Sequence, residues 1–92
     1  MLTLDSIPQP NAAVQGRRLE TEAVLVWPAK GEVKVLNDVG ASIWQLLDSQ
    51  RTVREIVQQI CREYAVSATE AEADALSFLK ELADRGLVTI RA

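Results

Sequence analysis

The chain is 92 residues long, with ten basic and thirteen acidic side chains and a formal net charge of −3 at pH 7. A net acidic domain disfavours nucleic-acid binding, because phosphate contacts need lysine and arginine. Histidine is absent, which excludes a Ser-His-Asp triad and histidine-ligated metals, and the single cysteine, Cys61, can form neither an internal disulfide nor a thiolate zinc site. We therefore expect one domain over residues 1–92 that is not an enzyme and that uses no metal and no cofactor.

The N-terminal residues carry no targeting signal. They read MLTLDSIPQP, without a basic region followed by an apolar one, and no apolar run in the chain approaches the ~20 residues that span a bilayer. We expect a cytoplasmic protein without a membrane partner. Residues 1–13 are rich in turn formers, and Pro8 and Pro10 exclude a central strand there, so this segment is expected to be a mobile arm.

Strands are predicted in the first half of the chain. Residues 23–27, AVLVW, are β-branched and aromatic, and a Pro-Ala-Lys-Gly turn follows them. Residues 32–36 alternate between two faces, with Val33 and Val35 on the apolar face, which is typical of a half-buried strand. Residues 14–19 are predicted to add a third strand and complete a meander.

Helical patterns occupy the second half of the chain. Asn37 is a favourable N-cap for a first helix, and Thr52 with Glu55 forms a capping box for a second. A third helix begins near Ser67 or Thr69, because each has a glutamate three residues later. The last residues are expected to pack back as a short strand or tail. The order predicts an α+β domain, a three-stranded antiparallel sheet followed by three helices.

The residues capable of chemistry favour structural interpretations. Residues 67–84 carry five acidic side chains and one lysine, which is typical of a solvated helix face rather than of paired catalytic carboxylates. Cys61 lies on the apolar stripe of the second helix and is expected to be a buried, inert thiol.

Two features indicate a binding surface. If residues 32–36 form an edge strand, their backbone groups can pair with a partner strand, unless the N-terminal arm or a second copy of the chain covers them. Along the side of the third helix runs a stripe of Ala71, Asp74, Ala75, Phe78 and Leu82. This stripe is either part of a broad surface that faces the core or the wall of a shallow apolar groove for a peptide.

Three motifs of the chain resemble the PqqD-like family. They are Leu-Asn-x-x-Gly-Ala-x-Ile-Trp from residue 36, Arg-Thr-Val-x-Glu-Ile from residue 51, and Gly-Leu-Val from residue 86. The resemblance spans residues 14–90 and implies a fold of three strands and three helices related to winged helix-turn-helix domains, without catalytic activity. Members of this family bind the leader segment of ribosomally synthesised and post-translationally modified peptides and present it to a maturation enzyme.

In the family, the leader adds as a strand beside the third strand and lies against the third helix. Carried onto this chain, the docking strand consists of Glu32, Val33, Lys34, Val35 and Leu36, and the facing wall of Ala71, Asp74, Ala75 and Phe78. The implied partners are a precursor-peptide leader and a maturation enzyme. The free-standing chain and its Leu-Asn-x-x-Gly-Ala helix start favour the leader peptidase and cyclase of a lasso-peptide pathway. The alternative is a radical S-adenosylmethionine enzyme, as in pyrroloquinoline quinone synthesis.

Two other interpretations stay open. A winged-helix regulator would bind DNA through the third helix, but residues 67–84 carry a net charge of −4, from one lysine and five acidic residues. A homodimer with paired edge strands would cover the docking strand. We expect a monomer or a weak dimer.

Overall fold

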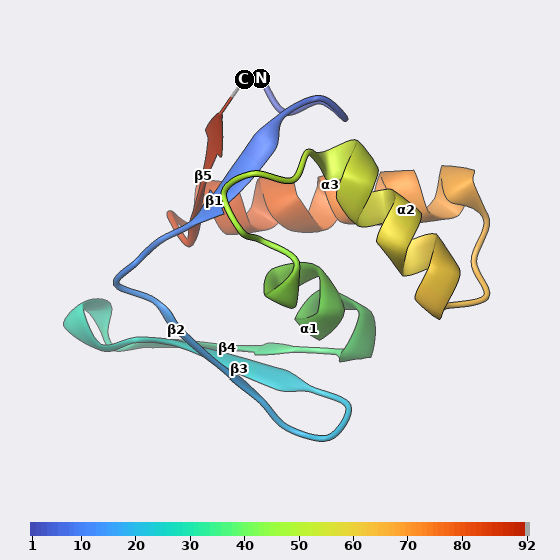
Figure 1. The fold of residues 1–92 in the computed structure, drawn as a ribbon. Helices are drawn as coiled ribbons and strands as arrows, with labels where there is room; N and C mark the ends of the chain where they lie inside the picture. The colour runs from blue at the N-terminus through green and yellow to red at the C-terminus, as the bar shows by residue number, and fades with distance from the viewer. Residues whose placement is uncertain (92) are drawn as a thin grey trace.

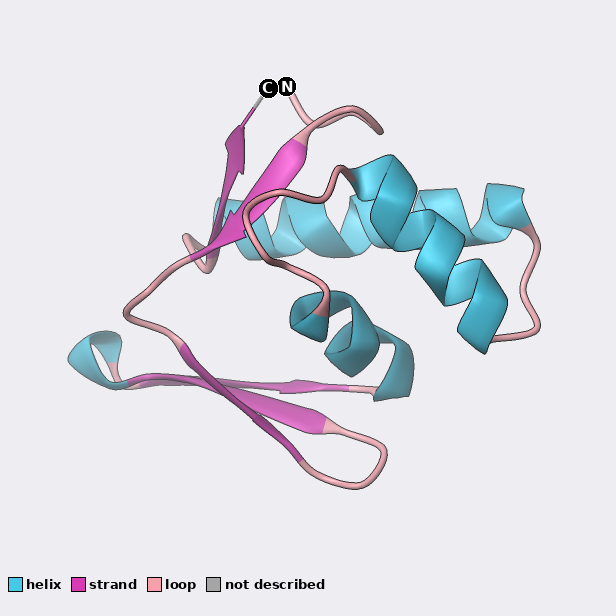
Figure 2. Ribbon diagram, in the orientation of Figure 1, coloured by secondary structure: helices cyan, strands magenta, loops and turns pink. Residues whose placement is uncertain are grey.

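The computed structural model describes residues 1–91 and has an α+β fold with two antiparallel sheets and three helices (Figure 1). The strands are β1 (Ile7–Pro10), β2 (Gln15–Arg18), β3 (Ala23–Trp27), β4 (Glu32–Leu36) and β5 (Val88–Arg91). The helices are α1 (Asp38–Gln45), α2 (Val53–Glu63) and α3 (Ala68–Asp84), and a 3-10 turn (Pro28–Lys30) joins β3 to β4. The three-stranded sheet lies on one side of α1, and α2 and α3 lie on the other (Figure 2). None of the helices in residues 1–91 has the length and apolar character needed to cross a membrane.

The three-stranded sheet has the order β2-β3-β4, so β4 lies at one edge. The β2–β3 hairpin closes through the N–H of Leu19, which donates to the carbonyl of Glu22 at 2.8 Å. Between β3 and β4, Gly31 adopts a left-handed conformation with φ of 63°, which glycine tolerates because it has no Cβ. Its N–H donates to the carbonyl of Pro28 at 3.1 Å. These two tight turns set the register of the meander.

Each helix begins with a side-chain cap. Asn37 caps α1, and the capping box of Thr52 and Glu55 is present at the start of α2. The cap of α3 is Ser67 rather than Thr69, because the Ser67 hydroxyl accepts the backbone N–H three residues later at 3.2 Å. These caps satisfy N–H groups that have no partner within the helix.

Apolar side chains from the sheet and the helices form one core. Its largest fully buried members, each less than 2% exposed, include Leu25, Val53, Ile56, Leu79 and Leu82. The apolar stripe of α2 packs against α3, as the helical spacing predicts. At the end of β4, Leu36 is 2% exposed, so the core anchors this strand just before α1 begins.

Residues 1–13, expected to be a mobile arm, are instead held against the domain. Strand β1 pairs antiparallel with β5 to form a two-stranded ribbon. The carbonyls of Leu4 and Ser6 accept the N–H groups of Arg54 and Val53 at 2.9 and 3.0 Å. Those N–H groups belong to the first turn of α2 and lack partners within the helix, which explains why the arm is fastened there. Prolines are compatible with β1 because an edge strand needs hydrogen bonds on one side only.

Candidate functional site

The side of β4 that faces away from β3 is open. Within residues 1–91, β4 pairs only with β3, so a row of its backbone groups is free to bind another strand. The N-terminal residues do not cover this edge, because β1 pairs with β5. The sequence left two segments that could cover this edge, the N-terminal arm and a second copy of the chain. Within the described residues, the arm is excluded.

Val33 and Val35 were expected on the buried face of β4, but they point away from the core. Val33 and Val35 are 63% and 59% exposed, whereas Leu36 is buried and Lys34 is half-buried. Leu36 lies opposite the buried Ala23 and must face the core, and the period of two then places Lys34 on the same inner face. The apolar face of β4 is thus the outer face of the sheet, because the register and not the polarity of the residues decides the orientation.

An ion pair joins β4 to α3, between the Lys34 ammonium and the carboxylate of Glu81. We call the surface that this pair bridges the β4–α3 groove. The hydrogen bond from Lys34 and its positive charge hold the pKa of the Glu81 carboxyl below its usual value. At the end of β3, the ring of Trp27 lies near Gly86, and a Cβ on this glycine would be 3.4 Å from the ring.

Beyond the end of β4, a pocket of about 370 Å³ lies between α1, α2 and α3. The pocket is lined by Asn37, Val39, Gly40, Ile43, Ile60, Val66, Ala71, Asp74 and Phe78. Most of the lining is apolar, and its polar groups are the amide of Asn37 and the carboxylate of Asp74. Within residues 1–91 Asp74 makes no ion pair, so its carboxylate is available to accept a hydrogen bond from a ligand. An apolar pocket with one carboxylate at its rim suits a side chain with an apolar body and a donor at its tip.

The structure brings together three of the four residues predicted for the wall on α3. Ala71, Asp74 and Phe78 line the pocket, whereas Ala75 is 1% exposed and lies in the core. Ala75 was included because a sequence stripe does not define the rotation of a helix. The contribution of α1 and α2 to the pocket was missed, although Gly40 offered a signal, since glycine is unfavourable inside a helix.

Gly40 allows α1 to approach α3 closely. A Cβ at this position would lie 3.2 Å from Asn37 Oδ1 and 3.4 Å from the ring of Phe78. The first distance is tighter than most real Cβ contacts, so a larger residue would push on the cap of α1 or on the pocket wall. The close approach gives the pocket its depth.

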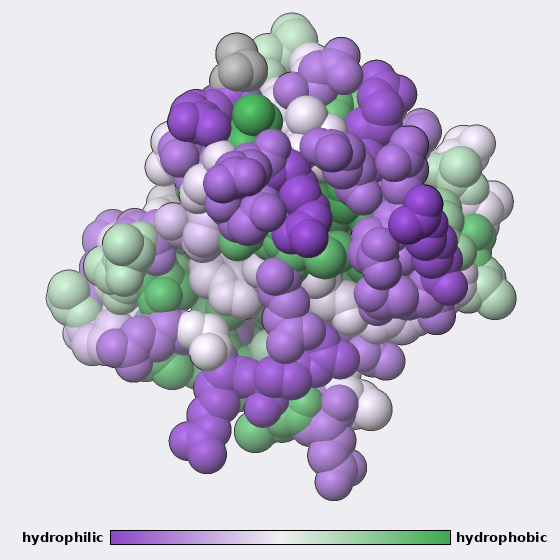
Figure 3. Space-filling view, in the orientation of Figure 1, coloured by the Kyte–Doolittle hydropathy of each residue, from purple (hydrophilic) through white to green (hydrophobic). Residues whose placement is uncertain are grey.

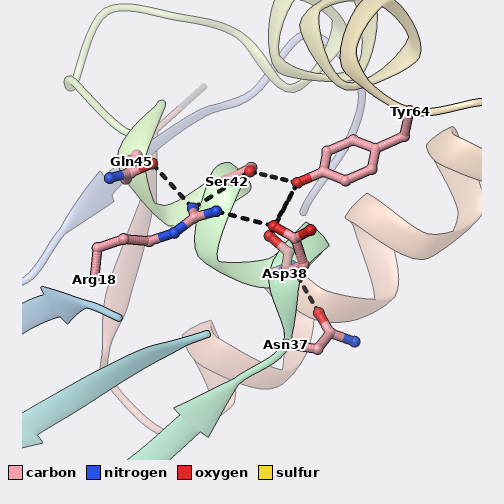
Figure 4. A network of polar contacts seen from close by, with 7 residues as sticks. Arg18, Asn37, Asp38, Ser42, Gln45 and Tyr64 are labelled. Atoms are coloured by element: carbon pink, nitrogen blue, oxygen red, sulfur yellow. Dashed lines mark hydrogen bonds and ion pairs between the residues drawn. The ribbon is translucent and has the colours of Figure 1, made fainter. Parts of the chain in front are cut away.

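A polar network fixes the start of α1 beside the pocket (Figure 4). Arg18 on β2 forms an ion pair with Asp38 at 2.9 Å and donates a hydrogen bond to Gln45 at 3.1 Å. The Tyr64 hydroxyl, at the end of α2, lies 2.9 Å from Asp38 Oδ1 and 2.7 Å from Ser42 Oγ. The network therefore ties β2 and α2 to the helix that supplies Asn37 and Gly40 to the pocket.

A second surface lies on the outside of the sheet. The register places Val24, Val26, Val33 and Val35 on one side of neighbouring strands β3 and β4, and we call this patch the outer valine face. On β2, Arg17 lies opposite Val24, and it makes no ion pair within residues 1–91. In Figure 3, hydrophobic surface is visible among the hydrophilic side chains at the lower edge, where the sheet lies.

In residues 1–91, no cluster of three or more His, Cys, Asp or Glu residues is placed to hold a metal ion. Cys61 is half-buried on α2 and is not among the residues that line the pocket. The site offers backbone groups, apolar walls and one free carboxylate, which are the elements of recognition.

An open edge strand, with an apolar pocket between the helices beyond its end, defines a class of small α+β domain whose geometry suits β-strand addition. Residues 22–88 match the family model described as coenzyme PQQ synthesis protein D, and the chain belongs to this PqqD family.

Curated relatives and solved structures agree with this assignment. The "PqqA binding protein" of Rhodopseudomonas palustris (strain BisB5) is 33% identical over 70 residues, which cover 76% of this chain and 69% of the relative. The protein of the same name from Gluconobacter oxydans is 32% identical over 77 residues, 80% of each chain.

Two solved structures share the fold at a TM-score of 0.79. The first is TbiB1 in complex with the TbiA(beta) leader peptide, at 35% identity, covering 87% of this chain and 93% of that one. The second is lasso peptide synthetase B1 complexed with the leader peptide, at 25% identity, covering 90% and 98%.

Proposed function

We propose that this chain binds the leader segment of a ribosomally synthesised precursor peptide, without catalysis, by adding it as a strand to the open edge of β4. The observation that carries the proposal is the unpaired side of β4 next to the pocket between α1 and α3. In such binding, backbone hydrogen bonds provide affinity and side-chain pockets provide specificity. Further support comes from the two similar structures, whose titles name a bound leader peptide.

Each part of the site has a physical role in this proposal. The backbone of residues 32–36 pairs with the leader, and Ala71 and Phe78 provide an apolar wall. Asp74 accepts a hydrogen bond from a donor side chain of the leader. Because the open edge and the pocket are formed in the free chain, little ordering of the protein is required on binding, which favours affinity.

The bound leader is presented to a maturation enzyme that docks on the outer valine face. Val33 and Val35 are more than half exposed, and they lie on the same strand as the proposed leader edge. A leader strand beside β4 would widen this face, so an enzyme that docks there would contact protein and leader together. An apolar enzyme surface with a carboxylate opposite Arg17 would complement it.

The leader peptidase and cyclase of a lasso-peptide pathway are the favoured partners. The two structural neighbours come from leader-peptide complexes, and one is named a lasso peptide synthetase B1. The alternative is a radical S-adenosylmethionine enzyme of pyrroloquinoline quinone synthesis, which the family description and the curated relatives favour.

Binding to synthetic leader peptides tests the proposal. Leaders and core peptides from short open reading frames beside the gene would be titrated against the purified chain by fluorescence polarisation. Saturable binding to one leader, and none to its core peptide, is the expected result. If no leader binds to the chain alone or with the neighbouring maturation enzyme present, the proposal is wrong.

DNA binding is not favoured by the geometry. The relation to winged helix-turn-helix domains stays a prediction, and the first turns of α3 expose acidic rather than basic side chains. A monomer or weak dimer also stays a prediction, which sedimentation at several concentrations tests.

A further inference from the structure

An ion pair joins the two walls of the proposed leader site, β4 and α3. Lys34 extends from the inner face of β4, and Glu81 lies on α3 three residues after the pocket residue Phe78. The Lys34 side chain is 21% exposed and the Glu81 side chain 53% exposed. The ammonium is thus partly removed from water and paired, and the pair bridges the two walls between which a peptide would lie.

The position of Lys34 determines what a docked strand would meet there. In the register, Lys34 lies opposite Leu25, which is 1% exposed, so its side chain leaves β4 on the core side. A strand added to the open edge places one residue directly opposite Lys34, with its Cβ about 4.5–5.5 Å from the Lys34 Cβ and on the same face. That side chain points at the ion pair.

The ion pair stands on the face of β4 that this side chain would share. The pocket does not extend to it, because its lining begins at Asn37 and Phe78 and includes neither Lys34 nor Glu81. A bulky leader residue opposite Lys34 would have to displace the ion pair or cover it and remove it from water, and both are unfavourable.

We propose that the Lys34–Glu81 ion pair is a specificity-determining element that admits only a small uncharged leader residue, such as glycine, alanine or serine, opposite Lys34. This inference rests on the proposed function, since it assumes that a leader strand pairs with β4. A charged residue is also disfavoured, because the pair is already neutral and the added charge would lose hydration without gaining a net counter-charge. The inward-facing leader residue two positions towards the pocket is not restricted, so the pair selects a small residue two positions away from one that can be larger.

The test combines leader variants with protein variants. Each residue of the synthetic leader that binds the chain is replaced in turn by leucine, and affinities are measured by fluorescence polarisation. With the unaltered chain, we expect one position at which leucine weakens binding by about tenfold or more. With the double variant Lys34→Ala/Glu81→Ala, the penalty at that position should fall to about twofold or less, while other positions keep their values.

A matched control is available on the same helix. Lys80 and Asp84 form an exposed ion pair at 2.9 Å outside the β4–α3 groove. The variant Lys80→Ala/Asp84→Ala removes a comparable pair and should retain the full leucine penalty. The single variant Glu81→Ala, with thermal unfolding measured in parallel, provides a second test if the double variant is unstable.

The outcomes are distinct. The proposed role of the ion pair is supported if Glu81→Ala and the double variant relieve the leucine penalty and the control variant does not. An equal penalty in all proteins, or tolerance of leucine at every position, overturns it while leaving leader binding intact. Failure of every leader to bind the unaltered chain overturns the proposed function and this inference with it.

Discussion

The Tyr64 hydroxyl lies 2.9 Å from Asp38 Oδ1 and joins the end of α2 to the first turn of α1. It also donates towards the backbone carbonyl of Asp38 at 3.2 Å and lies 2.7 Å from Ser42 Oγ. Asp38 lies two residues after the end of β4 and two residues before Gly40, which lines the pocket. One phenol group thus couples the helical layer to the proposed docking site.

Replacing Tyr64 with phenylalanine should loosen this connection. Tyr64→Phe keeps the ring and removes the hydroxyl, so the free energy of unfolding should fall by about 1–2 kcal/mol, as for a hydrogen bond to a charged group. Leader affinity should fall several-fold, because the start of α1 is less well held. Urea unfolding and peptide titration measure both effects. Unchanged stability would show that the network contributes nothing to the fold.

The close approach at Gly40 predicts that a substitution there affects binding more than stability. Gly40→Ala adds a Cβ close to Asn37 Oδ1 and Phe78. Helix propensity favours alanine by up to about 1 kcal/mol. This gain opposes the cost of the close contacts, so the free energy of unfolding should change little. Leader affinity should fall because the pocket narrows.

Gly31 provides the control for Gly40. It has φ of 63° and open space around it, so Gly31→Ala should cost about 1–2 kcal/mol of stability. It should leave leader affinity unchanged, because Gly31 lies outside the pocket. Equal effects of the two variants on binding would contradict a specific role for Gly40.

Proline substitutions test strand addition at β4. Successive backbone N–H groups of a strand point to opposite sides, so one of Lys34 and Val35 donates towards β3 and the other towards the open edge. Lys34→Pro and Val35→Pro should therefore differ in stability, and the more stable variant should still lose leader affinity by about tenfold or more. Thermal unfolding identifies that variant. If the more stable variant binds the leader normally, pairing along this edge is excluded.

The outer valine face can be altered without changing β4. Val24 and Val26 lie on the central strand β3 and point outwards, and Val24→Thr/Val26→Thr keeps branched side chains of similar size while adding hydroxyl groups. Leader affinity should be unchanged, and processing of the precursor by the maturation enzyme should slow. Peptide titration and a reconstituted processing assay separate the two steps. Normal processing by this variant would place the enzyme elsewhere.

Two carboxylates should contribute to acid unfolding. Lys34 lowers the pKa of Glu81 from its usual 4.5, and the backbone N–H groups of Arg51 and Gln50 lower that of Asp48 from 3.8. A depressed folded-state pKa stabilises the protein above the unfolded-state pKa, and the stabilisation is lost as pH falls through the folded value. Glu81→Gln and Asp48→Asn should each flatten the decrease of unfolding free energy below about pH 4.5.

Removal of Lys34 provides the control for this pH dependence. Lys34→Met should flatten the decrease of unfolding free energy at acidic pH as Glu81→Gln does. The double variant Lys34→Met/Glu81→Gln should flatten it no further. Additive effects in the double variant would contradict the assignment of the Glu81 shift to Lys34.

Much of the fold is encoded locally and was predicted from the sequence. The strands 23–27 and 32–36 have the expected bounds, and the caps at Asn37 and Thr52 are present. The period of 3.6 also identified the buried face of α2. These features depend on neighbours within a few residues, which the sequence displays directly.

The orientation of β4 and the position of the N-terminal residues were decided by tertiary structure. The alternation in residues 32–36 identified two faces but not which one meets the core, and burial of Leu36 made that choice. The pairing of β1 with β5 joins residues at opposite ends of the chain, and no local pattern encodes it. Likewise, the rotation of α3 determines that Ala71 and Phe78 line the pocket while Ala75 enters the core. Hydrogen bonding and periodicity specify elements locally, whereas the surface left open for a partner is known only after the elements have packed.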